Sequence, residues 1–246
     1  MIGNAIDAAE QNYFAAWRLM TSHMNDGVVH ETDAILYTAI PHPVAFFNSA
    51  FVKPPADPLA CIDEVRAFFA ASGNPFTLRF RDAPGLDAAC AAAGLAPAAV
   101  NPVMNVDVES VAPPAIAVER ADATNWADHV SALCRGFDMP LDFGSVLFDP
   151  TLIDTDDFVA FNACVDREVA ATAALIVSDG VAGVYNVATP EPWRRRGLGE
   201  AATRAAVAEG RERGCSIATL QSSDMGYPIY ERMGFRTIVN WRSVTG

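Results

Sequence analysis

Basic residues are scarce in this sequence. Lys and Arg number 17 against 30 Asp and Glu, which gives a formal net charge of −13 at pH 7. General binding of nucleic acid requires a basic surface that neutralises phosphates, and an anionic membrane surface attracts basic segments. The charge balance therefore argues against nucleic acid and membrane as partners.

Metal-binding, disulfide and export patterns are also missing. The five cysteines are odd in number and form no CxxC pair, and the four histidines form no HxxxH or HExxH pattern. No apolar run reaches the ~18 residues of a membrane helix, and the N-terminus lacks the basic and apolar regions of a signal peptide. We therefore expect no metal, reduced thiols and a cytoplasmic location.

The composition is that of a folded protein. Hydrophobic residues make up 51% of the 246 positions and charged residues 19%, which excludes wholesale disorder. Residues 110–114 read SVAPP, and two adjacent prolines interrupt both helices and central strands. The sequence thus predicts two domains, residues 1–112 and 115–246.

The order of elements is clearest after this linker. Hydrophobic spacing predicts strands over 116–119, 158–163, 169–177, 181–189, 216–221 and 235–244, and helices over 122–134, 197–213 and 227–233. The three strands between 158 and 189 are so close together that we expect an antiparallel meander. Segment 138–157 is acidic and rich in turn residues, and no element is predicted there.

The first half repeats part of this order. Strands are predicted over 34–38, 45–52, 76–80 and 98–108, and helices over 61–71 and 86–93. Segment 86–95 ends in Ala-Ala-Gly-Leu, as segment 227–235 ends in Arg-Met-Gly-Phe. This similarity suggests an internal repeat, and the alternative is an accessory α/β domain.

The most informative motif is PWRRRGLG at residues 192–199, between a predicted strand and a predicted helix. Gly197 and Gly199 leave the backbone of the first helical turn open to a ligand. First-turn N–H groups have no partner within a helix, and with the helix dipole they favour an anion such as a diphosphate. A solvated, arginine-rich turn is the alternative.

A second motif is Tyr230 one turn before Gly234-Phe235. Gly234 is typical of the residue that ends a helix. Taken alone, Tyr230 is more typical of a tyrosine that packs by its ring.

The order of these elements resembles the GCN5-related N-acetyltransferase (GNAT) family. Its signature Arg/Gln-x-x-Gly-x-Gly/Ala is matched by Arg194, Gly197 and Gly199, and its later tyrosine and Gly-Phe by Tyr230 and Gly234-Phe235. The resemblance covers residues 116–244. It implies an α/β (α+β) fold with a mixed, mostly antiparallel sheet and flanking helices, in tandem if the first half is a second, degenerate copy.

The resemblance also implies acetyl-CoA as cosubstrate and the amine of a small molecule or peptide as acceptor. The departures from the family pattern are Ser223, where an asparagine is common, and two prolines before the loop in place of one. The residues expected to bind acetyl-CoA are Val187, Thr189, Arg194, Arg195, Arg196, Gly197, Leu198, Gly199, Glu200 and Ser223.

In the implied mechanism, the amine attacks the thioester directly and Tyr230 donates a proton to the leaving thiolate. Candidates for the base are Tyr185, Asn186 or an acid within 138–157. In the first half, the loop position reads KPPADPL at 53–59, without glycine, and Cys90 replaces the tyrosine. We expect this half to have lost cofactor binding and to form one wall of the acceptor cleft.

Two other functions fit the same residues. One is a non-catalytic acyl-CoA-binding sensor, and the other is an interaction domain whose arginine loop meets an acidic partner. The acidic surface would steer a cationic amine to the enzyme, unless it serves only solubility. Monomer and homodimer both fit the sequence.

Overall fold

The computed structural model describes residues 2–246, and side chains from residue 5 onward. Its helices are α1 (Ile2–Ser22), α2 (Ile62–Ala70), α3 (Leu86–Ala92), α4 (Trp126–Gly136), α5 (Leu141–Leu147), α6 (Leu198–Glu212) and α7 (Tyr227–Arg232). Its strands are β1 (Val28–Glu31), β2 (Ile35–Ala39), β3 (Ser49–Val52), β4 (Thr77–Arg81), β5 (Ala96–Asp107), β6 (Glu119–Arg120), β7 (Phe158–Val165), β8 (Glu168–Ser178), β9 (Val181–Ala188), β10 (Ile217–Gln221) and β11 (Arg236–Thr245).

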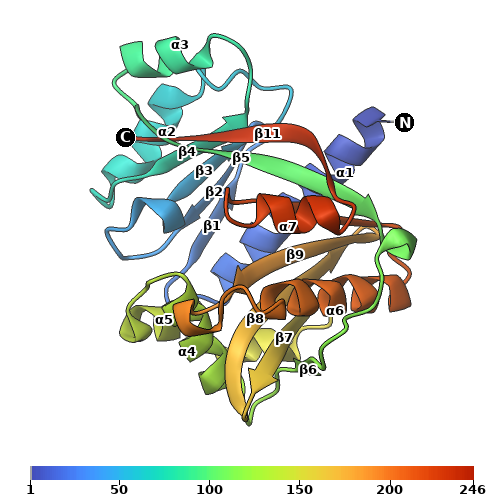
Figure 1. Cartoon of the computed structure of the whole chain (residues 1–246). Coiled ribbons are helices and arrows are strands. Elements are labelled where there is room, and N and C mark those ends of the chain that lie inside the picture. The colour runs from blue at the N-terminus through green and yellow to red at the C-terminus, as the bar shows by residue number, and fades with distance from the viewer. Residues whose placement is uncertain (1) are drawn as a thin grey trace.

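All the strands join in one mixed, mostly antiparallel sheet (Figure 1). The strand order is β1-β2-β3-β4-β11-β5-β10-β9-β8-β7-β6. Strands β3 and β4 are parallel, as are β9 and β10, and every other pair is antiparallel. Each half thus contributes its last strand to the centre, where β11 lies beside β4 and β5 lies beside β10.

The two halves repeat one another in detail as well as in strand order. The amide of Phe235 donates to the carbonyl of Tyr230 at 3.0 Å, and the amide of Leu95 donates to that of Cys90 at 2.9 Å. In both places a glycine with positive φ, Gly234 or Gly94, ends the preceding helix. This confirms the expected repeat. The boundary at 112–115 stays a prediction, because the sheet runs without interruption across it.

Helices cover both faces of the sheet. α1 and α4 pack in one apolar core on one face, together with buried side chains of β7, β8, β9 and β11. On the other face, α6 and α7 cover the second half of the sheet, and α2 and α3 cover the first half. Figure 1 shows α6 and α7 in front of the strands, with α1 behind them.

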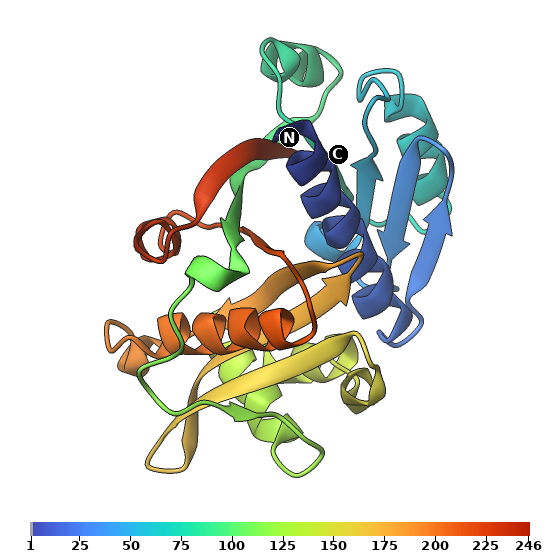
Figure 2. The same ribbon diagram turned by 90° about the vertical axis from the view of Figure 1, so that its right-hand side faces the viewer.

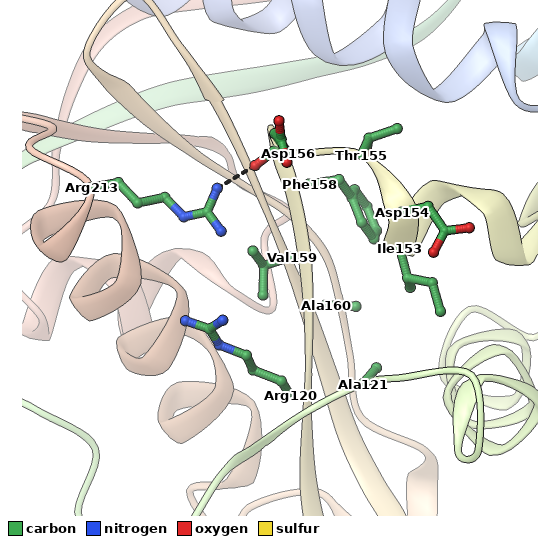
Figure 3. Close-up of a pocket in the computed structure, with 10 residues that line it drawn as sticks. All are labelled: Arg120, Ala121, Ile153, Asp154, Thr155, Asp156, Phe158, Val159, Ala160 and Arg213. Carbon is green, nitrogen blue, oxygen red and sulfur yellow. Dashed lines mark hydrogen bonds between the residues drawn. The ribbon is translucent and has the colours of Figure 1, made fainter.

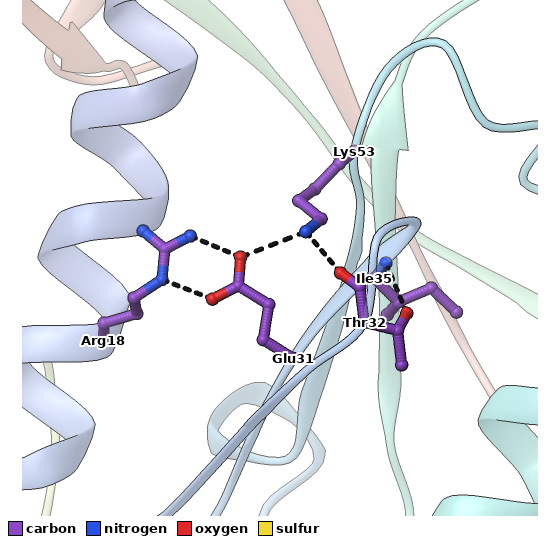
Figure 4. Close-up of polar contacts among 5 residues, drawn as sticks. All are labelled: Arg18, Glu31, Thr32, Ile35 and Lys53. Carbon is purple, nitrogen blue, oxygen red and sulfur yellow. Dashed lines mark hydrogen bonds and ion pairs between the residues drawn. The ribbon is translucent and has the colours of Figure 1, made fainter.

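α1 connects the two halves. Figure 2 shows it between the blue strands of the first half and the orange hairpin of β8 and β9. At its C-terminal end, Arg18 donates to Glu31 at 2.8 and 2.6 Å, and Lys53 reaches the same carboxylate at 3.0 Å (Figure 4). These contacts tie α1 to β1 and to the end of β3.

The structure corrects four expectations from the sequence. Segment 45–52 is a short 3-10 helix followed by β3, and the strand expected at 116–119 is the two-residue β6. α1 and α5 were not predicted. α1 spreads its apolar side chains round much of its surface because it is buried between two halves, so it lacks a simple amphipathic stripe. The meander β7-β8-β9 is confirmed.

Candidate active site

The two parallel strands β9 and β10 separate along their length. They pair from Val181 and Ile217 only as far as Gly183 and Thr219. Beyond this point β9 continues to Ala188, and β10 to Gln221, without pairing to one another. The result is an opening in the sheet whose edges carry backbone N–H and C=O groups.

A β-bulge lies on the β9 side of this opening. Thr172 of β8 pairs with Ala188 and Ala174 pairs with Tyr185, so β9 has one extra residue between these positions. Asn186 in the bulge has φ of +52°, which asparagine tolerates better than most residues. The Thr172 hydroxyl donates to the Asn186 carbonyl at 2.9 Å. Sequence reasoning missed Thr172, and the only hint of the bulge was an asparagine inside a predicted strand.

The arginine–glycine loop follows directly after β9. Arg195 and Gly197 both have positive φ, of +61° and +77°. The consecutive backbone amides of residues 195–200 donate to no acceptor within residues 2–246. They include the first turn of α6, whose dipole adds positive potential. The loop is thus a ready anion site, in which the strained conformation of Arg195 is typical of functional loops.

Three of the predicted binding residues converge where β9 meets α6. A Cβ on Gly199 would lie 2.8 Å from Thr189 Oγ1 and 3.8 Å from Val187 Cγ1. At Gly197 such an atom would meet only Ile116, at 3.7 Å. Gly199 is therefore required by a close approach, whereas Gly197 is required by its positive φ.

The three arginines differ in what they contact. The Arg194 guanidinium is engaged by the protein, since it donates to the carbonyls of Thr189 at 3.0 Å and Gly136 at 3.5 Å. Arg196 lies over the Trp193 ring at 4.9 Å, and Arg195 is exposed. Arg194 thus holds the loop against the ends of β9 and α4, whereas the side chains of Arg195 and Arg196 form no ion pair with the described residues.

The other two loop residues lie within α6. Leu198 is buried in an apolar cluster beneath the loop. Glu200 is paired with Arg204 one turn later at 2.8 Å, which neutralises a carboxylate near the anion site. Both residues would therefore contribute their backbone amides to a ligand.

Tyr230 packs between α7 and the start of α6. Its side chain is 9% exposed, and its ring meets Phe235 at 5.9 Å. Burial raises the pKa of Tyr230 to about 12, and hydrogen bonding by Thr203 acts in the opposite direction. Thr203 in turn donates to the Gly199 carbonyl at 2.9 Å. Tyr230 is therefore one side chain away from the glycine loop, and its hydroxyl is protonated at neutral pH.

Ser223 lies on the exposed turn between β10 and α7. Its hydroxyl accepts from the Gly226 amide at 3.2 Å, and its carbonyl accepts from Tyr227 at 2.9 Å. The hydroxyl thus stabilises the start of α7, and its role toward a ligand stays a prediction.

The structure removes one candidate base. Tyr185 is buried and donates its hydroxyl proton to Asn12 at 2.7 Å. Burial raises the pKa of Tyr185 well above its ordinary value, so at neutral pH it holds its proton and cannot accept one. Asn186 has no basic lone pair to offer, because an amide nitrogen donates only.

The corresponding loop of the first half lacks these features. Pro54, Pro55 and Pro58 have no N–H group, and the amides of Ala56, Leu59, Cys61 and Ile62 already donate within the loop. The first turn of α2 carries the carboxylates of Asp63 and Glu64. The chemistry of this loop does not fit a diphosphate.

A hollow of about 530 Å³ lies elsewhere, at the C-terminal end of α6 (Figure 3). Arg213 and Arg120 lie on one side of the β7 edge, and Phe158 and Asp154 on the other. Both arginines pair with Glu209. α6 has 15 residues and is therefore roughly 22 Å long, so this hollow is remote from the glycine loop at the other end.

Residues 127–235 match the family model described as the acetyltransferase (GNAT) family. A search of curated proteins returned no match. Within residues 2–246, no group of three or more His, Cys, Asp or Glu could hold a metal ion, and no helix is long and apolar enough to cross a membrane.

Solved structures match over almost the whole chain. A GCN5-related N-acetyltransferase from Kribbella flavida is 21% identical, with a TM-score of 0.73 over 98% of this chain and 94% of that chain. One from Sphaerobacter thermophilus is 12% identical, with a TM-score of 0.60 over 87% and 80%. A tandem GNAT protein from the clavulanic acid biosynthesis pathway is 13% identical, with a TM-score of 0.61 over 91% and 84%. Residues 127–235 thus match the GNAT acetyltransferase family, within a fold that the chain shares over most of its length with a tandem GNAT protein.

Proposed function

We propose that this protein binds acetyl-CoA in the opening between β9 and β10 and transfers the acetyl group to an amine. The main support is the row of unpartnered amides at 195–200, directly beside that opening. These amides, with Arg195 and Arg196, would hold the pyrophosphate. The unpaired backbone at Val187 in β9 and at Thr189 just after it would bind the pantetheine arm.

The β9 bulge would supply the chemistry at the thioester. A backbone N–H of Val187 would face the carbonyl oxygen and stabilise the negative charge that develops during attack. A neutral amine held beside the thioester would attack the carbonyl carbon, so that much of the rate gain comes from positioning. The C–S bond breaks as the C–N bond forms.

Tyr230 would protonate the leaving sulfur. With a pKa of about 12, the tyrosine is a weaker acid than its ordinary value suggests. Relative to a thiol pKa of about 8.5, complete proton transfer would be uphill by roughly 5 kcal/mol. Tyr230 would thus stabilise the thiolate first as a hydrogen-bond donor. The proton that the attacking nitrogen loses as it becomes the amide would then balance the proton taken up by the sulfur, so that free CoA thiol leaves and Tyr230 stays neutral.

A second candidate function is binding of acyl-CoA without turnover, as in a sensor. The burial of Tyr230 favours this reading, because a general acid must reach the sulfur. Release of free CoA thiol in the presence of an amine separates the two functions. An enzyme releases thiol at a rate that depends on the amine, whereas a sensor binds acetyl-CoA with equal affinity and releases none.

The test of the binding site is calorimetric titration with acetyl-CoA. Gly197→Glu places a carboxylate in the anion site at a position with positive φ, and Gly73→Glu makes the same change at an open position with φ of +67°. We expect one acetyl-CoA per chain, and binding weakened about tenfold or more by Gly197→Glu, equivalent to about 1.4 kcal/mol, but not by Gly73→Glu. Equal affinity of both variants, or two sites per chain, would contradict the proposal.

A further inference from the structure

Asn12 lies on α1, and both polar atoms of its side chain form hydrogen bonds with the second half of the chain. The two hydrogens of its Nδ2 are shared among three acceptors, the carbonyls of Ile176 at 3.0 Å and Val181 at 3.2 Å and Ser178 Oγ at 2.9 Å. Its Oδ1 accepts from the Tyr185 hydroxyl at 2.7 Å. Asn12 itself is 0% exposed, so no water competes for these bonds.

The backbone of β9 is adapted to this side chain. A Cβ on Gly183 would lie 1.9 Å from Asn12 Oδ1 and 2.5 Å from the Tyr185 ring. Any other residue at 183 would therefore displace Asn12, or α1 with it. Gly183 is also the last residue of β9 that pairs with β10, so the contact is made where the two strands separate.

Tyr185 is the residue directly before the bulge. Its ring packs in the apolar core on the α1 side, whereas Val187 packs on the α6 side. In a regular strand, residues two apart share a face. The bulge at Asn186 therefore places the Val187 side chain on the face opposite to that of Tyr185. The Thr172 hydroxyl holds the bulge from the β8 side, at the Asn186 carbonyl. Asn12 and Thr172 therefore fix the bulge from its two ends.

We propose that Asn12, acting through Tyr185, is a positioning residue for acetyl transfer. By holding the Tyr185 hydroxyl it fixes the strand on one side of the bulge, and with it the direction of the Val187 N–H. The first half of the chain thereby takes part in the chemistry of the second half. This inference rests on the proposed acetyl transfer.

The test is Tyr185→Phe, which removes one oxygen atom and leaves the ring packing. We expect kcat for release of CoA thiol, with spermidine as the probe amine, to fall about tenfold to a hundredfold, because small misplacements of reacting groups have effects of this size. The Kd for acetyl-CoA should change much less than kcat, since the 195–200 amides that would hold the pyrophosphate are untouched. Amide hydrogen exchange at Asn186 and Val187 should become faster.

The matched control is Ser178→Ala, which removes one partner of Asn12 but keeps its bond to Tyr185. We expect kcat and the exchange of both amides to match those of the unaltered protein. Equal kcat in Tyr185→Phe and the unaltered protein, an equal loss in Ser178→Ala, or unchanged amide exchange in Tyr185→Phe would each overturn the inference. If the unaltered protein binds acetyl-CoA but does not acetylate spermidine, transfer to such an amine is wrong, and amide exchange alone decides the role of Asn12.

Discussion

Gly199 on the first turn of α6 lies directly against Thr189, the residue that follows β9. A Cβ on Gly199 would come within 2.8 Å of Thr189 Oγ1, closer than real Cβ contacts allow. The distance between the 195–200 loop and the end of β9 is therefore set by the absence of one side chain.

Gly199→Ala should weaken acetyl-CoA binding while leaving the stability of the protein nearly unchanged. The new methyl group pushes Thr189 away from the loop, and overpacking of this kind costs about 1–3 kcal/mol. Since alanine favours a helix over glycine by about 1 kcal/mol, the melting temperature should change little. We expect acetyl-CoA binding to weaken about tenfold by calorimetry.

The double variant Gly199→Ala/Thr189→Ala supplies the control for this change. Removing the Thr189 hydroxyl, together with its γ-methyl group, makes room for the new methyl group, and affinity should recover most of its loss. An equally weak double variant would mean that Gly199 acts through something other than its contact with Thr189.

Tyr230→Phe should lower turnover without lowering affinity. The hydroxyl is the proposed proton donor, and removal of a general acid reduces rates by about a hundredfold or more. The matched control is Tyr227→Phe on the same helix, whose hydroxyl contacts Thr237 at 3.2 Å on the exposed side. Steady-state kinetics and acetyl-CoA titration of both variants check this prediction, and it is wrong if the two variants have the same kcat.

His129 on α4 should make stability depend on pH. It is 1% exposed, stacks on Trp126 at 5.0 Å and has Nδ1 2.7 Å from Asn162 Oδ1, so the neutral ring donates from Nδ1. Burial lowers the pKa of His129 from 6.5 to about 4, and the bond to Asn162 opposes this shift. The unfolded chain takes up a proton below pH 6.5 and the folded chain only near 4.

His129 should consequently lower the free energy of unfolding by roughly 3 kcal/mol as pH decreases from about 6.5 to about 4. Below pH 4 its contribution should be constant. Urea unfolding at several pH values measures the slope. His129→Gln should flatten it relative to the unaltered protein, whereas His30→Gln, on the exposed strand β1, should not. Parallel curves for all three proteins would contradict the assignment.

The sequence was most informative where the signal is local. The glycines at 197 and 199, the helix after them and the Tyr-x-x-x-Gly-Phe ending of α7 all depend on residues within a few positions of one another. The meander β7-β8-β9 was predictable for the same reason, since short turns join its strands. α1 was not, because both halves bury it on most of its surface and the buried polar residues Glu10, Asn12 and Thr21 interrupt its apolar pattern.

The sequence by itself determined which chemical groups are present: the glycine loop at 195–200, predicted to bind an anion through its backbone amides, Tyr230 and an excess of acidic residues. Only the tertiary structure decided how that chemistry is arranged. It placed β11 beside β4 and β5 beside β10, and it separated β9 from β10. It also brought Asn12 to Tyr185, 173 positions away in the sequence. Contacts of this kind leave no periodicity in the sequence, because they arise only after the two halves have packed together.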